Sequence, residues 1–163
     1  GGKIAIRPTA HMDPLPGSVV FATGTIVDRA KLTPAACASA LGYALPTLAN
    51  VAEAEGKWVS VAFISDRRMK QLNDMFRGKN TTTDVLSFPH EPDEFDPDKD
   101  NLGDIVISAE QAQKQATENG LTLEGEIKQL ILHGLLHLCG YDHETDNGEM
   151  NARELELREL LKI

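Results

Sequence analysis

The sequence predicts an α/β protein, in the broad sense that includes α+β folds, with one mixed sheet of about four strands and helices packed on it. Runs rich in β-branched and aromatic residues alternate with segments that begin at helix-capping residues, in the order β, α, β, α, β, β, α, α, α. At 163 residues, the chain has the length of one domain with its own core. The sequence contains no internal repeat and no low-complexity segment, so one sheet is expected to organise the domain.

The amino-terminal half predicts two strand–helix pairs. Residues 18–27 are rich in Val, Ile, Thr and Phe, and residues 58–64 alternate strongly, so both segments are expected to be strands. A helix is expected at 33–54, where a threonine cap is followed by a proline, although a glycine and a second proline interrupt its middle. A Ser–Asp pair predicts a second helix at 65–76.

The carboxy-terminal half predicts two strands and three helices. Residues 84–88 and 102–107 have the composition of strands. Each helix is expected to begin at a residue whose side chain can cap it, and the first of these is a capping box with Gln111. The capping residues are Ser108, Thr122 and Asp146.

The helix that follows Thr122 is apolar on nearly all of its faces and carries two histidines. Ile127, Ile131 and the leucines around them predict that it is buried. His133 and His137 are four residues apart, so they project from one face about one turn apart. Imidazoles on a buried helix need hydrogen-bonding partners, and a shared metal ion would satisfy both.

A glycine and a third histidine complete the motif. Gly140 can take a positive φ and end the helix, so that His143 can turn back toward the first two histidines. Three imidazoles without a fourth protein ligand leave a metal position open for water. The spacing therefore predicts a catalytic metal site.

The spacing matches the zincin pattern H-E-x-x-H-x-x-G-x-x-H, with one difference. Gly134 stands where the peptidases carry the glutamate that takes a proton from metal-bound water. Peptide hydrolysis is therefore the weaker interpretation of this motif.

Three carboxylates near the motif are candidates for secondary roles. Asp142 can orient a histidine or serve the turn. Glu126 lies two turns before His133, too far to act as its base, and Asp84 is expected to bond the backbone where its strand begins.

The motif resembles the signature of a known family. Residues 133–143 read H-G-x-L-H-L-x-G-Y-D-H, the pattern of the YbeY family of metal-dependent endoribonucleases, also called rRNA maturation factors. Residues 76–79 and 83–89 are similar to the family's Y-R-G-K-x-x-x-T-D-V-L-S-F-P, with Phe76 in place of the tyrosine, and residues 102–105 are similar to its L-G-D-I segment. The resemblance spans about residues 58–143.

The resemblance implies a site and an activity. His133, His137 and His143 would hold one Zn2+ per chain and, with Arg77, form the catalytic set. The implied activity is single-strand-specific endoribonuclease action in ribosomal RNA maturation and ribosome quality control, with single-stranded RNA, the ribosome and its proteins as partners. We expect metal-bound water or hydroxide to attack an RNA phosphodiester, or to activate that attack, while Arg77 holds the phosphate.

Two other functions fit parts of the same pattern. A zinc peptidase-like hydrolase would use the same histidines with a carboxylate from elsewhere. A non-catalytic, ribosome-associated binding factor would use the metal as a structural element, and it would bind RNA without cutting it.

Net charge argues against RNA binding, but the charge distribution permits it. The formal net charge is −9, whereas nucleic-acid binders usually carry a basic surface. The acidic excess lies in the polar loop at 91–100 and at 144–159. The basic residues gather instead between positions 67 and 79: Arg67, Arg68, Lys70, Arg77 and Lys79.

The remaining features concern the compartment and the chain ends. Cys37 and Cys139 show no pairing pattern, and Cys139 is expected to be a small core residue rather than a ligand. Reduced thiols, no secretory signal and no run of about 20 apolar residues predict a cytoplasmic protein without a membrane partner. Residues 1–11 are interpreted as the remnant of an expression tag, and residues 12–163 as the single metal-dependent endoribonuclease domain.

Overall fold

A computed structural model describes residues 5–6, 20–21, 51–54, 57–91, 93–97, 99 and 101–163. The strands in these ranges form one mixed sheet, which confirms the predicted fold class. They are β1 (Ala5–Ile6), β2 (Val20–Phe21), β3 (Trp58–Ile64), β4 (Val85–Pro89) and β5 (Asn101–Ser108). The helices are the 3-10 turn η1 (Ala52–Ala54), α2 (Asp66–Arg77), α3 (Ala109–Glu118), α4 (Leu123–Leu138) and α5 (Glu149–Leu161).

The sheet has the order β1-β3-β5-β4, and β2 also pairs with β3. β3 is parallel to β1, β2 and β5, whereas β4 runs antiparallel to β5. The predicted count of about four strands is close, because two of the five described strands have only two residues each. β4 is the last strand in this order, so its outer side, the edge that faces away from β5, pairs with none of the described strands and can form the wall of a cleft.

Most of the predicted elements appear close to their predicted bounds. β3 spans the predicted 58–64, while β4 is shifted by one residue along the chain and β5 is one residue longer at each end. β2 lies inside the predicted strand at 18–27, and η1 occupies the end of the helix predicted at 33–54. The rest of those two predicted elements, and Cys37, lie outside the described residues.

The predicted caps explain where three helices begin. The Ser65 side chain accepts a hydrogen bond from the Arg68 amide, Ser108 from Gln111, and Thr122 from Gly125. Each bond satisfies one of the amides that a first helical turn leaves without a partner. These starts were predictable because each cap depends on neighbours in the sequence.

The start of α5 corrects the prediction that Asp146 caps the last helix. The helix begins at Glu149, and its cap position is Gly148, whose φ is +101°. The Asp146 carboxylate accepts hydrogen bonds from the amides of Gly148 and Met150 at 2.9 and 2.8 Å. Asp146 therefore does bind amides at the start of the helix, but it lies two residues before the cap position, which a left-handed glycine occupies.

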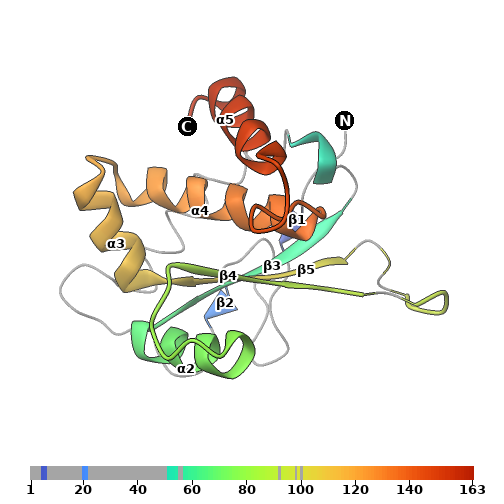
Figure 1. Ribbon diagram of the computed structural model, residues 1–163, viewed down its shortest axis with the longest axis horizontal. Helices are drawn as coiled ribbons and strands as arrows, with labels where there is room; N and C mark the ends of the chain where they lie inside the picture. The colour runs from blue at the N-terminus through green and yellow to red at the C-terminus, as the bar shows by residue number, and fades with distance from the viewer. Residues whose placement is uncertain are drawn as a thin grey trace.

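Helices cover both faces of the sheet. In Figure 1, α3, α4 and α5 lie on one side of the sheet and α2 lies on the other. Alternate side chains of the strands supply the two cores: Val61, Phe63 and Ile105 pack under α4, while Ala62, Ile64 and Val106 pack with Met69 of α2. None of the described helices is long and apolar enough to cross a membrane.

α4 is buried nearly all round, as its sequence predicts. Ile127, Ile131, Leu132 and Leu136 are at most 2% exposed. Gly134 lets the helix approach the sheet, because a Cβ there would lie 2.9 Å from the Ser87 hydroxyl and 3.1 Å from a methyl carbon of Ile105. The position where zincins carry their glutamate therefore has no room for a side chain.

Alanine at Gly134 should reveal this close packing. Alanine favours a helix over glycine by about 1 kcal/mol, but at this position it should also cost about 1–3 kcal/mol of overpacking. Gly125→Ala in the same helix is the matched control, because its Cβ would meet only Thr122 and Leu121, at 3.3 and 3.8 Å. Urea unfolding should find Gly134→Ala less stable than Gly125→Ala, and equal stabilities would contradict the packing.

Candidate metal centre

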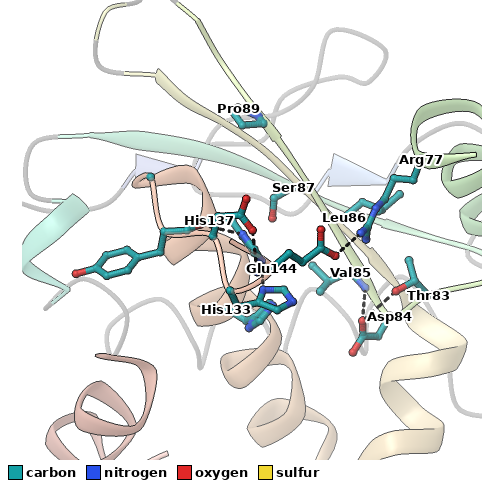
Figure 2. Close-up of a pocket in the computed structure, with 14 residues that line it drawn as sticks. Arg77, Thr83, Asp84, Val85, Leu86, Ser87, Pro89, His133, His137 and Glu144 are labelled. Atoms are coloured by element: carbon teal, nitrogen blue, oxygen red, sulfur yellow. Dashed lines mark hydrogen bonds and ion pairs between the residues drawn. The ribbon is translucent and has the colours of Figure 1, made fainter. Parts of the chain in front are cut away.

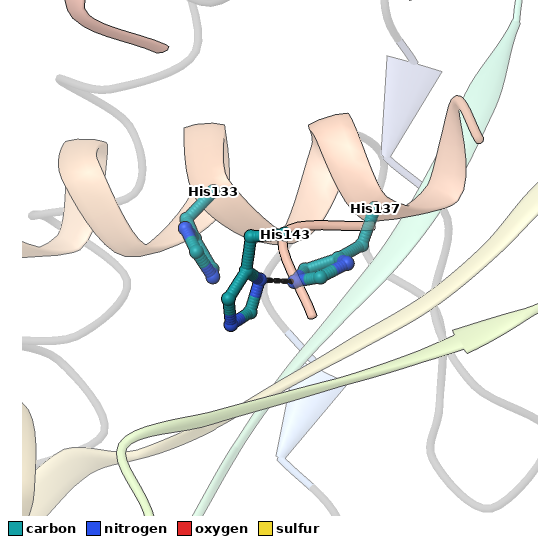
Figure 3. A group of neighbouring side chains, drawn as sticks. All are labelled: His133, His137 and His143. Carbon is teal, nitrogen blue, oxygen red and sulfur yellow. Dashed lines mark hydrogen bonds between the residues drawn. The ribbon is translucent and has the colours of Figure 1, made fainter. Parts of the chain in front are cut away.

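Three imidazoles converge at the carboxy-terminal end of α4. His133 and His137 project from one face of the helix toward His143, which lies in the turn after it (Figure 3). The ring centroids of the three pairs are 4.8, 5.3 and 4.9 Å apart. One potential ligand atom from each residue lies within 4.8 Å of the others, so the cluster is able to hold a metal ion.

The turn after α4 brings His143 back toward the helix. Gly140 has a φ of +104°, and the Tyr141 amide donates to the Leu136 carbonyl at 3.1 Å. Nδ1 of His143 then lies 3.1 Å from Nε2 of His137. Two nitrogens bound to one tetrahedral zinc would be about 3.3 Å apart, so this pair of rings needs little movement to share an ion.

Hydrogen bonds on the outer side hold the two helical histidines. Nδ1 of His133 lies 2.7 Å from a carboxylate oxygen of Glu154, and Nδ1 of His137 lies 3.1 Å from the Tyr141 carbonyl. A carboxylate and a carbonyl only accept, so the tautomer of each neutral ring that suits these contacts has its proton on Nδ1 and its lone pair on Nε2, facing the centre. Outer partners of this kind orient metal-binding histidines.

Burial and the neighbouring imidazoles favour the neutral form of His137. Burial lowers the pKa of this imidazole, and the neighbouring His133 and His143 lower it further. Neutral imidazole is the form that binds a metal. The cluster therefore fits a metal ion in its geometry, and His137 is held in the form that binds one.

Glu154 is the residue that the sequence analysis missed. It lies on α5, is 8% exposed, and its second oxygen accepts from Arg158 at 3.0 Å. Burial raises the pKa of this carboxyl, but the hydrogen bond from His133 and the charge of Arg158 outweigh it, so the pKa is lowered overall. The signal was present in the sequence, since Glu154 is four residues after Met150 on the apolar face of α5.

The three carboxylates considered in the sequence have structural contacts. Asp142 accepts from the Glu144 amide at 3.0 Å, which is its predicted turn role. Asp84 bonds the Val85 amide at 2.8 Å, as expected at the start of a strand. Glu126 is buried, and burial raises the pKa of its carboxyl. The orienting carboxylate of the cluster is instead Glu154.

Cys139 is packed against the core, as predicted. Burial and the nearby Glu53 raise the pKa of its thiol to about 11. A protonated thiol is a poor metal ligand, and Cys139 is not a member of the histidine cluster.

A cleft with a volume of about 490 Å³ opens beside the histidines, between α4 and the outer side of β4. Figure 2 shows His133 and His137 on one side of it and Arg77, from the end of α2, on the other. The Arg77 guanidinium donates to the Glu144 carboxylate at 2.8 Å. The structure thus brings all four residues of the predicted site to one cleft, although Arg77 comes from the opposite face of the sheet.

The fold and this cleft define a class of protein. Its members have a mixed sheet and a three-histidine cluster that is able to hold a metal, and the cluster lies beside a cleft that an arginine enters. Comparison with known families places the chain further. The model of the family described as Endoribonuclease YbeY matches residues 27–162. The chain belongs to this family, which confirms the resemblance seen in its sequence.

Individual relatives agree with the family assignment. The chain is 50% identical over 107 residues to Endoribonuclease YbeY of Nautilia profundicola, covering 66% of this chain and 74% of the relative. It is 43% identical over 113 residues to the Helicobacter pylori protein of the same name, covering 69% and 77%. The solution structure of TM1509 from Thermotoga maritima superposes with a TM-score of 0.54 at 30% identity, covering 76% of this chain and 81% of the other.

Proposed function

We propose that this protein is a metal-dependent endoribonuclease that cuts single-stranded RNA. The observation that carries the proposal is the shared cleft, in which the three histidines face an arginine whose guanidinium can bind a phosphate. The names of the relatives support the same activity. The family resemblance supports ribosomal RNA as the substrate, in its maturation and in ribosome quality control in the cytoplasm.

His133, His137 and His143 are proposed to hold one zinc ion. Three imidazoles with an open fourth position suit zinc. When bound, zinc would supply Lewis acidity and lower the pKa of a water ligand toward about 7. The protein's own part is to hold the rings so that their Nε2 or Nδ1 atoms face one point, and the Glu154 and Tyr141 contacts orient the two helical rings.

Arg77 is proposed to hold the scissile phosphate. Its side chain is 38% exposed and now pairs with Glu144, which is 56% exposed. An exposed ion pair of this kind contributes little stability, so a phosphate can displace the carboxylate at low cost. The planar guanidinium can then bind two phosphate oxygens and offset the charge that develops on them.

The close contact of Gly134 with the sheet disfavours the peptidase alternative. The base of the zincin pattern has no space at this position. The arginine opposite the histidines instead suits an anionic substrate such as RNA, because its guanidinium is positively charged. The binding-factor alternative differs from the proposal in one outcome, because it predicts RNA binding without cleavage.

The direct test measures cleavage of a labelled single-stranded RNA and of its matched duplex, with metal quantified by mass spectrometry. The single strand should be cut and the duplex spared, and cleavage should be lost on chelation and recovered when zinc is restored. RNA binding without cleavage, at one metal per chain, would favour the binding factor. Hydrolysis of peptides would favour the peptidase.

Glu154→Gln should weaken zinc binding by about 10–100-fold, the usual effect of losing an outer carboxylate partner. Glutamine keeps the size of the side chain but removes the charge that supports His133. Competition titration with a zinc chelator dye measures the affinity, and Glu159→Gln, an exposed change on the same helix, is the control. Unchanged affinity in Glu154→Gln would show that the contact only joins α5 to α4.

A further inference from the structure

Phe76 is an exposed aromatic residue that directly precedes Arg77, a residue that lines the cleft. It is the penultimate residue of α2, and 59% of it is exposed. Its ring meets Phe88 of β4 in an edge contact, with centroids 5.0 Å apart and planes at 69°. This contact fixes the ring while leaving much of it open to solvent.

The contact between Phe76 and Phe88 joins α2 to β4, and in both elements the residues next in sequence line the cleft. Arg77 follows Phe76 in α2 and lines the cleft, and Ser87 and Pro89 flank Phe88 in β4 and also line it. Phe88 itself packs on the α2 face of the sheet, and neither of the two rings lines the cleft. Phe76 therefore lies on the α2 side of β4, one residue before the arginine that reaches the cleft. An RNA chain that passes Arg77 and leaves the cleft toward α2 could contact this ring.

The charges around Phe76 suit a polyanion. Phe76 is followed by Arg77 and the exposed Lys79, and Asp74 is the one acidic side chain of α2 near it. Three more exposed basic residues lie in the first half of α2, on a chain whose net charge is −9: Arg67, Arg68 and Lys70. The contrast is Phe95, which is 84% exposed but stands between Glu94 and Asp96, in the acidic loop. Exposure alone does not distinguish the two rings, whereas their surroundings do.

We propose that Phe76 is a stacking site for one base of single-stranded RNA, next to the phosphate held by Arg77. This inference rests on the proposed function and adds a binding site to it. Aromatic side chains beside basic groups bind single strands because every base has a face that can stack. A duplex hides those faces, so the site would also contribute to the preference for single strands.

The test uses Phe76→Leu, because leucine keeps an apolar contact with Phe88 but has no aromatic face. Binding of a fluorescent single-stranded RNA octamer is measured by anisotropy, with a chelator present so that the RNA stays intact. Phe76→Leu should bind about tenfold more weakly, the scale of one lost stack, while Phe76→Tyr and Phe95→Leu should bind as the wild type does. Thermal unfolding checks that each variant is folded.

A scan with single abasic sites then identifies the stacked base. In the wild type, one abasic position should cost about as much affinity as Phe76→Leu does. The same abasic position should cost nothing further in Phe76→Leu, since the two changes remove one contact. Affinity of Phe76→Leu within twofold of wild type, or an equal loss in Phe95→Leu, would overturn the stacking site.

The two proposals fail in different ways. Wild-type protein that cuts single-stranded RNA but shows a flat abasic scan would disprove only the stacking site. Wild-type protein that neither binds nor cuts the RNA would disprove the proposed function, and the stacking site with it.

Discussion

His137→Ala should abolish RNA cleavage and remove the bound metal together. His137 is central to the cluster, with its ring centroid 4.8 Å from that of His133 and 4.9 Å from that of His143. A metal ion contributes several kcal/mol to hydrolysis, so the rate should fall by about a thousandfold or more. The measurements are single-turnover cleavage of a labelled RNA and metal content per chain.

His90→Ala is the matched control for this prediction. His90 lies outside the cluster, where its Nε2 is 2.6 Å from the Asp96 carboxylate. The control should keep metal and activity, which would exclude a general effect of removing a histidine. If His137→Ala kept one metal per chain, the ligand assignment would be wrong.

Arg77→Gln should keep the metal but lower RNA cleavage by about 100–1,000-fold, the range for removing one group that stabilises transition-state charge. The fold should not change, because the ion pair with Glu144 is exposed. Arg77→Lys should recover only part of the activity, since a lysine cannot bind a phosphate through a planar fork. Cleavage rates at saturating RNA, with metal content measured alongside, test both variants.

Glu144→Gln separates the two roles that Arg77 could have. It breaks the same ion pair but leaves the guanidinium in place. If Arg77 binds phosphate, Glu144→Gln should cut RNA at least as fast as the wild type, because it removes a competing carboxylate. An equal loss of activity in Glu144→Gln and Arg77→Gln would mean that the pair shapes the turn around His143 instead.

The two substitutions test opposite walls of one cleft. His137 belongs to α4, on one face of the sheet, and Arg77 ends α2, on the other. The outer side of β4 lies between them (Figure 2). Loss of cleavage in both variants, with metal lost in only one, would establish that binding the ion and binding the phosphate are separate tasks.

The sequence by itself determined the elements whose causes are local. Ser65, Ser108 and Thr122 cap their helices through amides three residues away. His133 and His137 share a face because an α-helix repeats every 3.6 residues. Gly140 was expected to allow the return of His143, and its positive φ does so. These features follow from backbone geometry over a few residues, which the sequence order specifies.

Only the tertiary structure decided the features that depend on distant parts of the chain. Glu154 reaches His133 because α5 packs on α4, and Arg77 reaches the cleft because α2 ends at the outer side of β4. Gly134 excludes a side chain because Ser87 and Ile105 lie against it. These contacts join elements many residues apart, and their energies come from burial and packing of whole surfaces. Sequence periodicity indicates which face is buried, but not which partner covers it.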